Sequence, residues 1–164
     1  MADALLTKEA VIEAHGANAA IAALLTADSS IITNAKFACN ELTLTVPREK
    51  IVTACEIVKQ AGYNFFEDVT AVDWYPSEPR FQLSYHILSM GLKERVRLCV
   101  LLDGGDAVVD SITGVWPSAN FYEREIFDLF GIRFGGHPNL RRIMMPEDWQ
   151  GHPLRKDYPV EGYR

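Results

Sequence analysis

The chain has 164 residues, of which 48% are hydrophobic and 23% charged, and its net charge is −6. This size fits a single domain with one core, and the composition excludes intrinsic disorder and a fibrous design. The longest apolar runs fall far short of the roughly 20 residues that span a bilayer, and an acidic chain without a basic face binds nucleic acid poorly, so we expect neither direct membrane insertion nor a nucleic-acid partner.

The first sixty residues predict the order helix, hairpin, helix. Ala, Ile and Leu recur at helical spacing from Lys8 to Ala27 and indicate one or two short helices. Two strands, 31–37 and 41–46, are expected next, the second with alternating apolar and polar residues. Pro47 then opens a helix, where its missing N–H has no cost, and Gly62 ends it.

The next segment predicts a meander of strands followed by a last helix. Turn-forming Pro and Gly residues separate four strands, at 69–74, 80–88, 95–102 and 107–112. The helix is expected from Asn120 to Phe130, with Asn120 as its cap, Glu123 reaching back to the cap and Gly131 as a left-handed end. Its expected buried stripe consists of Tyr122, Ile126, Leu129 and Phe130.

The remaining residues lack a regular pattern but are not hydrophilic. Four prolines interrupt the tail, which still carries apolar residues such as Met144, Trp149 and Leu154. From Gly131 onward there are six Lys and Arg against four Asp and Glu, so a basic tail follows an acidic body. The sequence therefore predicts an α+β single domain at 1–132, with a mostly antiparallel sheet packed against helices, and an extended Pro-rich C-terminal tail at 133–164 that docks on a partner.

A charged string lies on the last predicted helix. Glu123, Arg124, Glu125 and Asp128 put Arg124 and Asp128 one turn apart, where they can form an ion pair. A solvated helix face, a partner-binding face and acid–base catalysis all remain open for this string.

Two histidines stand in Gly-His-Pro contexts in the tail, at His137 and His152, with Asp148 and Asp157 nearby. Metal sites draw ligands from closely spaced pairs, which are missing here. Hydrogen bonding of each ring to a carboxylate or a carbonyl is the preferred interpretation, with a metal site as the alternative.

Short basic clusters occur within the apolar tail, at Arg141-Arg142 and at Arg155-Lys156-Asp157. Successive arginines on an extended chain point to opposite sides, so one can anchor to the parent domain while the other binds a partner. Trp149 and Tyr158 add aromatic surface, and aromatic residues with arginine are typical of interface hot spots.

Other sequence features favour a cytoplasmic protein without a catalytic motif. Cys39, Cys55 and Cys99 are widely spaced and are expected to be buried, reduced thiols. The N-terminus has no basic region before an apolar core, so no targeting signal is expected. Phosphate-binding glycine loops, Ser nucleophile elbows and Cys-His pairs are all missing from the sequence.

The region from Glu123 to Pro159 resembles a known family. Its Glu-Arg-Glu-Ile-Phe-Asp-Leu-Phe-Gly string at 123–131, His137 and the Leu-Arg-Arg-Ile string at 140–143 match the signature of the thirty-kilodalton subunit of respiratory complex I, the proton-pumping NADH:quinone oxidoreductase. The continuation at 145–159 looks like the rest of that family's tail.

The resemblance implies a non-catalytic scaffold subunit with no cofactor of its own. It would hold the quinone-site subunit and the cluster-bearing subunits of the peripheral arm in a hetero-oligomer, with FMN and iron–sulfur clusters in those partners. It would lie at the cytoplasmic side of the cell inner membrane. The candidate partner-binding residues are Glu123, Arg124, Glu125, Asp128, His137, Arg141, Arg142, Asp148, Trp149, His152, Arg155, Lys156, Asp157 and Tyr158.

Related complexes remain alternatives, because they reuse the same module. These are the photosynthetic NDH-type complex, dehydrogenases that use a reduced deazaflavin, and membrane-bound hydrogenases. The chain's end at Arg164 looks like the separate form of the subunit and not the form fused to the quinone-site subunit. A free-standing metal-dependent enzyme built on His137 and His152 is the alternative from another class, and a regulatory binding module is a third.

Overall fold

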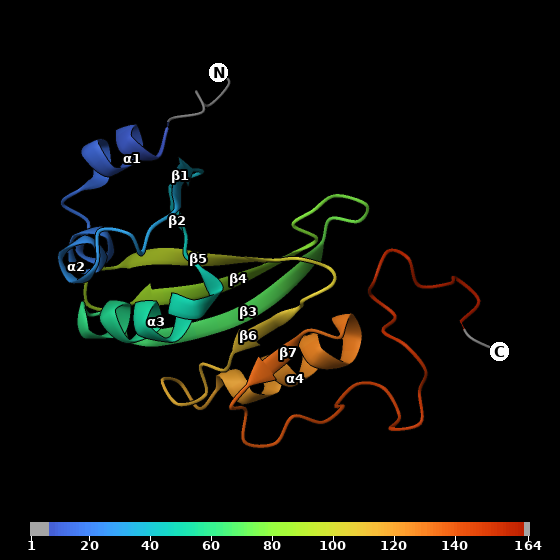
Figure 1. Ribbon diagram of the computed structural model, residues 1–164. Coiled ribbons are helices and arrows are strands. Elements are labelled where there is room, and N and C mark those ends of the chain that lie inside the picture. Colours follow the sequence, from blue (N-terminus) through green and yellow to red (C-terminus); the bar gives the residue numbers. More distant parts are fainter. Residues whose placement is uncertain (1–6, 163–164) are drawn as a thin grey trace.

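The computed structural model describes residues 7–162, whose arrangement is shown in Figure 1. Residues 1–6, on which the targeting prediction rests in part, and residues 163–164 lie outside the described residues. The elements follow in the order α1 (Lys8–His15), α2 (Ala19–Ala27), β1 (Asn34–Ala38), β2 (Glu41–Thr45), the 3-10 helix η1 (Arg48–Lys50), α3 (Ile51–Gln60), β3 (Phe65–Asp73), β4 (Phe81–Ser89), β5 (Glu94–Leu102), β6 (Val108–Asp110), α4 (Ala119–Phe130) and β7 (Arg133–Gly135).

A five-stranded sheet in the order β1-β2-β5-β4-β3 forms the centre of the domain. All neighbours are antiparallel except β2 and β5, which run parallel. Successive side chains of a strand point to opposite faces. In β4, Leu83, Tyr85 and Ile87 are fully buried, whereas Gln82, His86 and Leu88 on the opposite face are only half-buried. One face of the sheet therefore builds the core and the other faces outward.

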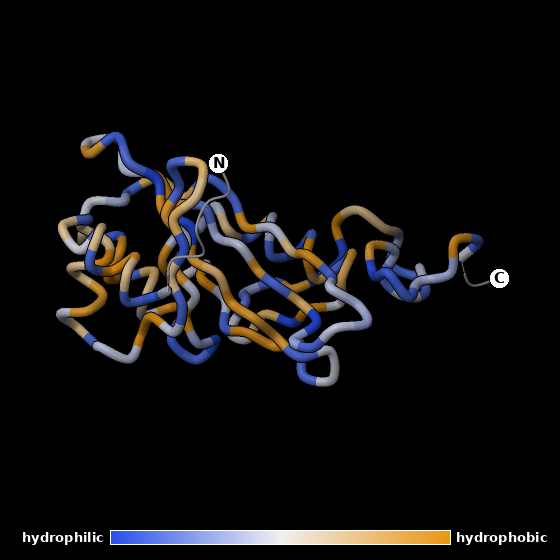
Figure 2. Tube along the Cα trace, turned by 90° about the horizontal axis from the view of Figure 1, so that it is seen from above, coloured by the Kyte–Doolittle hydropathy of each residue, from blue (hydrophilic) through white to orange (hydrophobic). Residues whose placement is uncertain are grey.

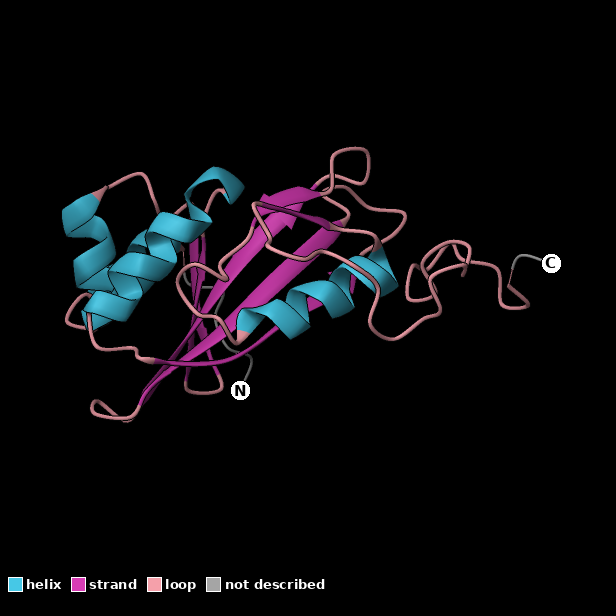
Figure 3. Ribbon diagram, turned by 90° about the horizontal axis from the view of Figure 1, so that it is seen from below, coloured by secondary structure: helices cyan, strands magenta, loops and turns pink. Residues whose placement is uncertain are grey.

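Helices cover the core face of the sheet, as Figures 1 and 3 show for α3 and α4. The apolar residues of α3 recur at helical spacing, and their side chains are fully buried: Ile51, Ala54, Cys55 and Val58. Helix α2 begins at a cap in which the Asn18 side chain accepts hydrogen bonds from the N–H groups of Ala20 and Ile21. Burial of these apolar faces, at about 25 cal/mol per Å², is the main favourable contribution to the stability of the fold.

A second, two-stranded sheet ties down both ends of α4. Strand β6 precedes the helix, β7 follows it, and the two pair in parallel with Val109 opposite Phe134. Both of these side chains are buried. Parallel strands need a crossover connection, and here α4 supplies it. The helix is thus held in place by a small β-α-β unit.

The two ends of α4 differ from each other in how well the sequence predicts them. The cap is Ser118, with no side-chain hydrogen bond, so the prediction that Asn120 caps the helix is wrong. Glu123 does not reach back to the cap either, because its side chain is fully buried. The prediction for the other end is confirmed: Gly131 has a φ of +72° and donates its N–H to the carbonyl of Phe127 at 3.0 Å.

The α+β class and the mostly antiparallel sheet are confirmed, including the β3-β4-β5 meander. The expected fourth strand of that meander is wrong, because β6 leaves the main sheet and pairs with β7. Strand β7 lies just past the predicted domain boundary at residue 132, so regular structure continues to Gly135. The buried stripe of α4 also shifts, because Glu123 and Asp128 are fully buried while Leu129 and Phe130 are half-buried.

The three cysteines are free thiols, but they do not share one environment. Cys55 and Cys99 are buried, as expected, whereas Cys39 is exposed, which corrects the prediction for that residue. Cys39 lies in the tight turn between β1 and β2, where it and Asn40 both have a positive φ. A turn that returns the chain at the edge of a sheet has no space to bury the side chain.

Within residues 7–162, no single helix has the length and apolarity to cross a membrane. Helices α1 and α2 satisfy both criteria only when taken together, and the chain bends by 116° between them.

We expect Leu98→Ala to lower the free energy of unfolding by about 2–5 kcal/mol, because Leu98 is fully buried in β5 and its loss leaves a cavity in the core. Leu101→Ala in the same strand is the matched control, since Leu101 is 43% exposed on the outer face, and its cost should stay below about 1 kcal/mol. Urea unfolding of both variants measures the difference. Equal costs would contradict the assignment of the two sheet faces.

Candidate functional site

After Gly135 the chain forms no further helix or strand among the described residues. Residues 136–162, here called the arm, run along α4 and then extend away from the domain, as the red segment of Figure 1 shows. Figure 2 shows that hydrophobic and hydrophilic residues alternate along the arm. The arm contains ten of the fourteen candidate partner-binding residues, and the other four lie on α4. The site is therefore the arm and the helix that supports it.

The C-terminal end of α4 holds the arm through its free carbonyl groups. The last carbonyls of a helix have no partners within the helix. In α4 they accept hydrogen bonds from the arm instead: the Asp128 carbonyl pairs with His152 Nδ1 at 2.9 Å, the Leu129 carbonyl with the Leu154 N–H at 3.0 Å, and the Phe130 carbonyl with Arg155 Nε at 2.6 Å. The negative end of the helix dipole adds to the attraction for the Arg155 guanidinium.

The carboxylate of Asp128 fixes the middle of the arm. One of its oxygens accepts three successive backbone N–H groups, those of Ile143, Met144 and Met145, at 2.8 to 3.0 Å. The other oxygen pairs with Arg142 at 2.6 Å. Burial alone would raise the pKa of Asp128, but these donors outweigh burial and lower it. Asp128 is thus a buried anion whose ligands are all supplied by the arm.

A second group of ionic interactions, in which Arg80 binds two carboxylates, fixes the distal part of the arm to the end of β3 and the loop that follows it. Arg80 binds Asp73 at 2.8 Å and Asp157 of the arm at 2.6 Å. Asp73 also accepts the backbone N–H of Lys156 at 2.9 Å. Burial opposes ionisation of Asp73, but Arg80 and the N–H donors of Lys156 and Tyr75 lower its pKa to about 2. The arm is therefore attached to two parts of the domain that lie far apart in the sequence: the end of α4, and the segment that contains Asp73 and Arg80.

Gly131 allows the helix to end and the arm to pack in the same place. A Cβ at this position would lie 2.5 Å from the His152 ring and 2.7 Å from the Arg155 guanidinium. Any side chain would displace both of these residues from the helix end. The glycine is needed for its positive φ and for the close approach of the arm.

Glu123 and His137 lie inside the protein. Glu123 accepts hydrogen bonds from the Ser111 hydroxyl at 2.6 Å and the Ile112 N–H at 2.8 Å. Burial raises the pKa of Glu123 to about 7 despite these two donors. The Asn139 N–H donates to His137 Nδ1, so that nitrogen carries no proton, and burial lowers the pKa of this ring. The 3.9 Å approach of His137 to Glu123 is therefore not an ion pair.

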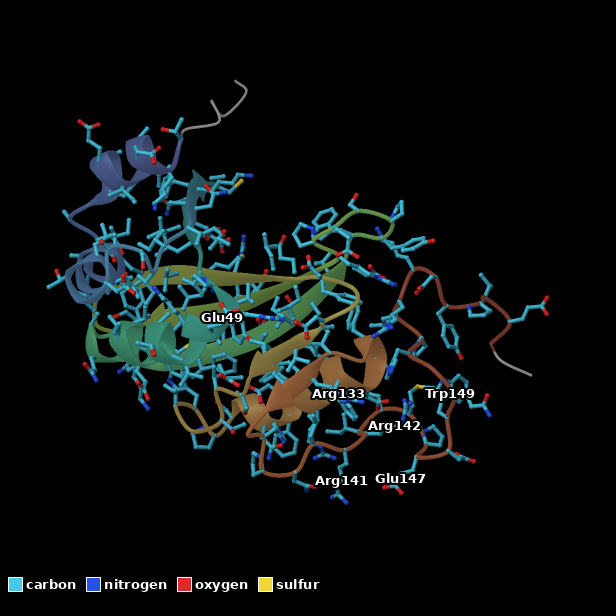
Figure 4. The ribbon with its side chains drawn as sticks, viewed as in Figure 1. Glu49, Arg133, Arg141, Arg142, Glu147 and Trp149 are labelled. Carbon is cyan, nitrogen blue, oxygen red and sulfur yellow. The ribbon has the colours of Figure 1, made fainter. Side chains whose placement is uncertain are left out.

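The two arginines of the Arg141-Arg142 pair point in different directions, as the sequence predicts and Figure 4 shows. Arg142 turns inward to Asp128 and the Gly151 carbonyl, whereas Arg141 is exposed. The predicted pairing of Arg124 with Asp128 is wrong, since Arg124 donates to the carbonyls of Arg141 and Arg142. The Asp128 carboxylate binds groups of the arm instead.

The two histidines of the arm are hydrogen-bonded to carbonyl groups, which confirms that part of the prediction. His152 pairs with the Asp128 carbonyl and His137 Nε2 lies 3.4 Å from the Asn120 carbonyl. Among the described residues, no group of three or more His, Cys, Asp or Glu side chains is arranged to hold a metal ion.

The outward side of the arm is rich in apolar and acidic side chains. Met144 is 63% exposed and Leu154 is 51% exposed, and Trp149 and Val160 are also exposed. The carboxylates of Glu147 and Asp148 are exposed as well. Exposed apolar side chains close to one another mark interaction sites in soluble proteins. The inward side of the arm thus binds the domain while the outward side remains open.

Sequence reasoning missed Asp73 and Arg80, which carry the distal attachment. Arg80 lies 77 residues from Asp157, and no local pattern links two such positions. The only signal was an Arg and an Asp flanking a turn rich in prolines between two strands.

An α+β domain with an ordered, irregular arm whose outer side carries apolar residues is typical of a subunit that binds other proteins. The family described as respiratory-chain NADH dehydrogenase, 30 kDa subunit, matches residues 44–164. The chain belongs to this family.

Curated relatives share one subunit name. The chain is 49% identical over 124 residues to the NADH-quinone oxidoreductase subunit designated C in Geobacter sulfurreducens. The aligned region covers 74% of this chain and 76% of the relative. It is 45% identical over 134 residues to the subunit of the same name in Roseiflexus sp., with 80% and 76% covered.

Two solved structures are similar. One is a trypsin-resistant fragment of Nqo5, residues 1–134, with a TM-score of 0.61 and 33% identity over 65% of this chain and 88% of the fragment. The other belongs to the membrane-bound sulfane sulfur reductase, an archaeal respiratory membrane complex, with a TM-score of 0.70 and 26% identity over 84% of this chain and 82% of that chain.

We expect Asp128→Ala to release the arm, because three N–H groups and the Arg142 guanidinium lose their acceptor. Hydrogen bonds to a charged group contribute about 1.5–3 kcal/mol, so trypsin should cut after Arg141 and Arg142 at least about tenfold faster. Limited digestion followed by mass spectrometry measures the rates. Glu125→Ala, an exposed site on the same helix, is the control, and equal cleavage in both variants would contradict the role of Asp128.

We expect Glu123→Gln to change how stability depends on pH. In the unfolded chain this carboxyl ionises near its usual pKa of about 4.3, whereas the folded protein holds the proton up to about pH 7. The folded state binds more protons in between, so Glu123 lowers stability as pH rises through this window.

The variant should therefore gain stability relative to the unmodified protein between pH 4 and pH 7, by on the order of 3 kcal/mol. Urea unfolding at several pH values measures this difference. Glu125→Gln should show no such trend, and a flat difference for Glu123→Gln would mean that the buried carboxyl is ionised throughout.

Proposed function

We propose that this chain is a non-catalytic scaffold subunit of the peripheral arm of a proton-translocating NADH:quinone oxidoreductase. The observation that carries the proposal is the ordered arm with an open outer side, in a chain of the 30 kDa subunit family. Relatives named as subunits of a multi-subunit enzyme support a hetero-oligomer. The chain would support electron transfer from NADH to quinone by holding the subunits that carry it out.

The partners in this proposal are the quinone-site subunit and the cluster-bearing subunits. The arm would dock on the quinone-site subunit through its outward side, where Met144, Trp149 and Leu154 are exposed. An arm that is already attached to its own domain loses little conformational entropy on binding, which favours affinity. Of the candidate residues, buried Glu123 and Asp128 would act through the arm's shape and not by direct contact.

FMN and the iron–sulfur clusters would reside in the partner subunits, and this chain would carry no cofactor. Its three cysteines are far apart in the sequence, two of them buried, which is unlike the clustered thiolates of iron–sulfur sites. We propose a position at the cytoplasmic side of the cell inner membrane, reached through partners and without direct insertion.

The equivalent subunit of a related respiratory complex is the alternative. The likeness to a chain of the membrane-bound sulfane sulfur reductase, with a TM-score of 0.70, favours it. In such complexes other subunits determine the electron donor. A free-standing metal-dependent enzyme has less support, since His137 and His152 both hydrogen-bond to carbonyl groups.

Affinity purification of the tagged chain from its native membranes in mild detergent tests the proposal. We expect the quinone-site subunit and cluster-bearing subunits to co-purify with NADH:quinone activity. Arg142→Ala should reduce their recovery several-fold, because Arg142 attaches the arm to Asp128, while the isolated chain stays folded. Lys36→Ala, exposed on β1, is the control.

Other outcomes separate the alternatives. Subunits of a different oxidoreductase in the purified complex would assign the chain to that complex. Recovery of the chain alone, with stoichiometric metal, would overturn the scaffold function. An Arg142→Ala complex that assembles fully but fails to transfer electrons would also contradict it.

A further inference from the structure

The outer end of the arm carries a depression between two parts of the arm itself. Two hollows of about 260 and 400 Å³ adjoin there, because Trp149, Tyr158, Glu161 and Gly162 line both. The Tyr158 hydroxyl donates to the Gln150 carbonyl at 3.3 Å and so connects the two sides of the depression. Figure 4 shows Trp149 in this outer part of the arm, beyond Arg142.

The depression is acidic. Asp148 lines the smaller hollow and Glu161 lines both. Both residues are exposed, and within residues 7–162 neither carboxylate has a hydrogen-bond or ion-pair partner. A nearby cation could therefore pair with them without displacing an existing bond.

None of the basic side chains of the arm lines either hollow: three of them contact the domain, and the fourth, Arg141, is exposed elsewhere on the arm. Arg142 binds Asp128, Arg155 binds the Phe130 carbonyl, and Lys156 lies 6.0 Å above the ring of Trp74. The lining of the depression therefore contains acidic residues and no basic ones. Complementary charge on a binding partner is positive.

The walls of the depression are aromatic and apolar as well. The Trp149 indole is 38% exposed, and Pro159 and Val160 border the larger hollow. A guanidinium group stacks on an aromatic face and binds carboxylates through its planar fork, whereas an ammonium group is a compact and strongly hydrated charge. The combination of one indole with two free carboxylates matches arginine better than lysine.

We infer that this depression binds an arginine side chain from a partner subunit, with the guanidinium against Trp149 and between the carboxylates of Asp148 and Glu161. This inference rests on the proposed function, which supplies the partner. It identifies the partner surface as a basic segment with apolar neighbours. Glu147, which lies next to Asp148 but outside the lining, takes no part in it.

Co-expression of the full chain with the peripheral-arm subunits provides the test. The double variant Asp148→Asn with Glu161→Gln keeps shape and removes both charges, and Glu147→Gln is the matched control. We expect the double variant to weaken retention of the chain in the purified complex by roughly tenfold, as for close interfacial charge pairs, with a flatter dependence on NaCl. Trp149→Ala should weaken retention at all salt concentrations, and Glu147→Gln should stay within about twofold.

The outcomes are distinguishable. If the unmodified chain fails to enter the complex, the proposed function and this inference both fall. If it enters and the double variant is retained as well as Glu147→Gln, the inference alone is overturned. Urea unfolding of the isolated variants checks that each still folds, which is expected because the altered carboxylates make no hydrogen bonds or ion pairs within the described chain.

A photo-crosslinking amino acid in place of the exposed Val160 gives a second, independent readout in the assembled complex. We expect a crosslink to one partner segment that contains an arginine, whose replacement by Ala should weaken retention to the same extent as the double variant. A crosslink to a segment with lysine alone, to a second copy of this chain, or to no protein would overturn the inference.

Discussion

Helix α4 ends with carbonyl groups that have no partners within the helix, and the arm supplies donors to three of them. The buried carboxylate of Asp128, in the last turn, accepts three further N–H groups and a guanidinium. Without the other, both the helix end and the arm would leave hydrogen-bonding groups without partners. These hydrogen bonds between the helix end and the arm determine the position of the arm, the need for glycine at 131 and the open outer surface.

The arrangement assigns the two tasks of the proposed docking segment to different sides of the arm. Charged and backbone groups on the inward side bind the domain through Asp128, Asp73 and Arg80. Apolar and acidic groups on the outward side make few contacts and remain available. Order on one side lowers the entropic cost of binding on the other. Because prolines restrict its backbone, the arm can be ordered without regular secondary structure.

Local patterns in the sequence were sufficient for most of the fold. The structure confirms three such predictions: the strand from the alternation in β2, the helix from the spacing in α3, and the helix end from the glycine after Phe130. Contacts between distant residues were beyond such reasoning. Glu123 has the spacing of a capping residue but is buried against Ser111, and Asp128 has the spacing of a partner for Arg124 but binds Arg142. The inward and outward arginines were foreseeable; the pairing of Arg80 with Asp157 was not.

The distal attachment joins Lys156 to Asp73 across 83 residues, so its acceptor exists only after β3, β4 and the loop between them have formed. The arm is synthesised after the rest of the domain and has no place to bind on an incompletely folded chain. A partner that recognises the attached arm would therefore bind only chains in which the sheet behind the arm has formed. Chains that misfold in the centre of the domain would present no docking surface and would be left out of the assembly, so that a contact at the edge of the molecule acts as a check on its interior.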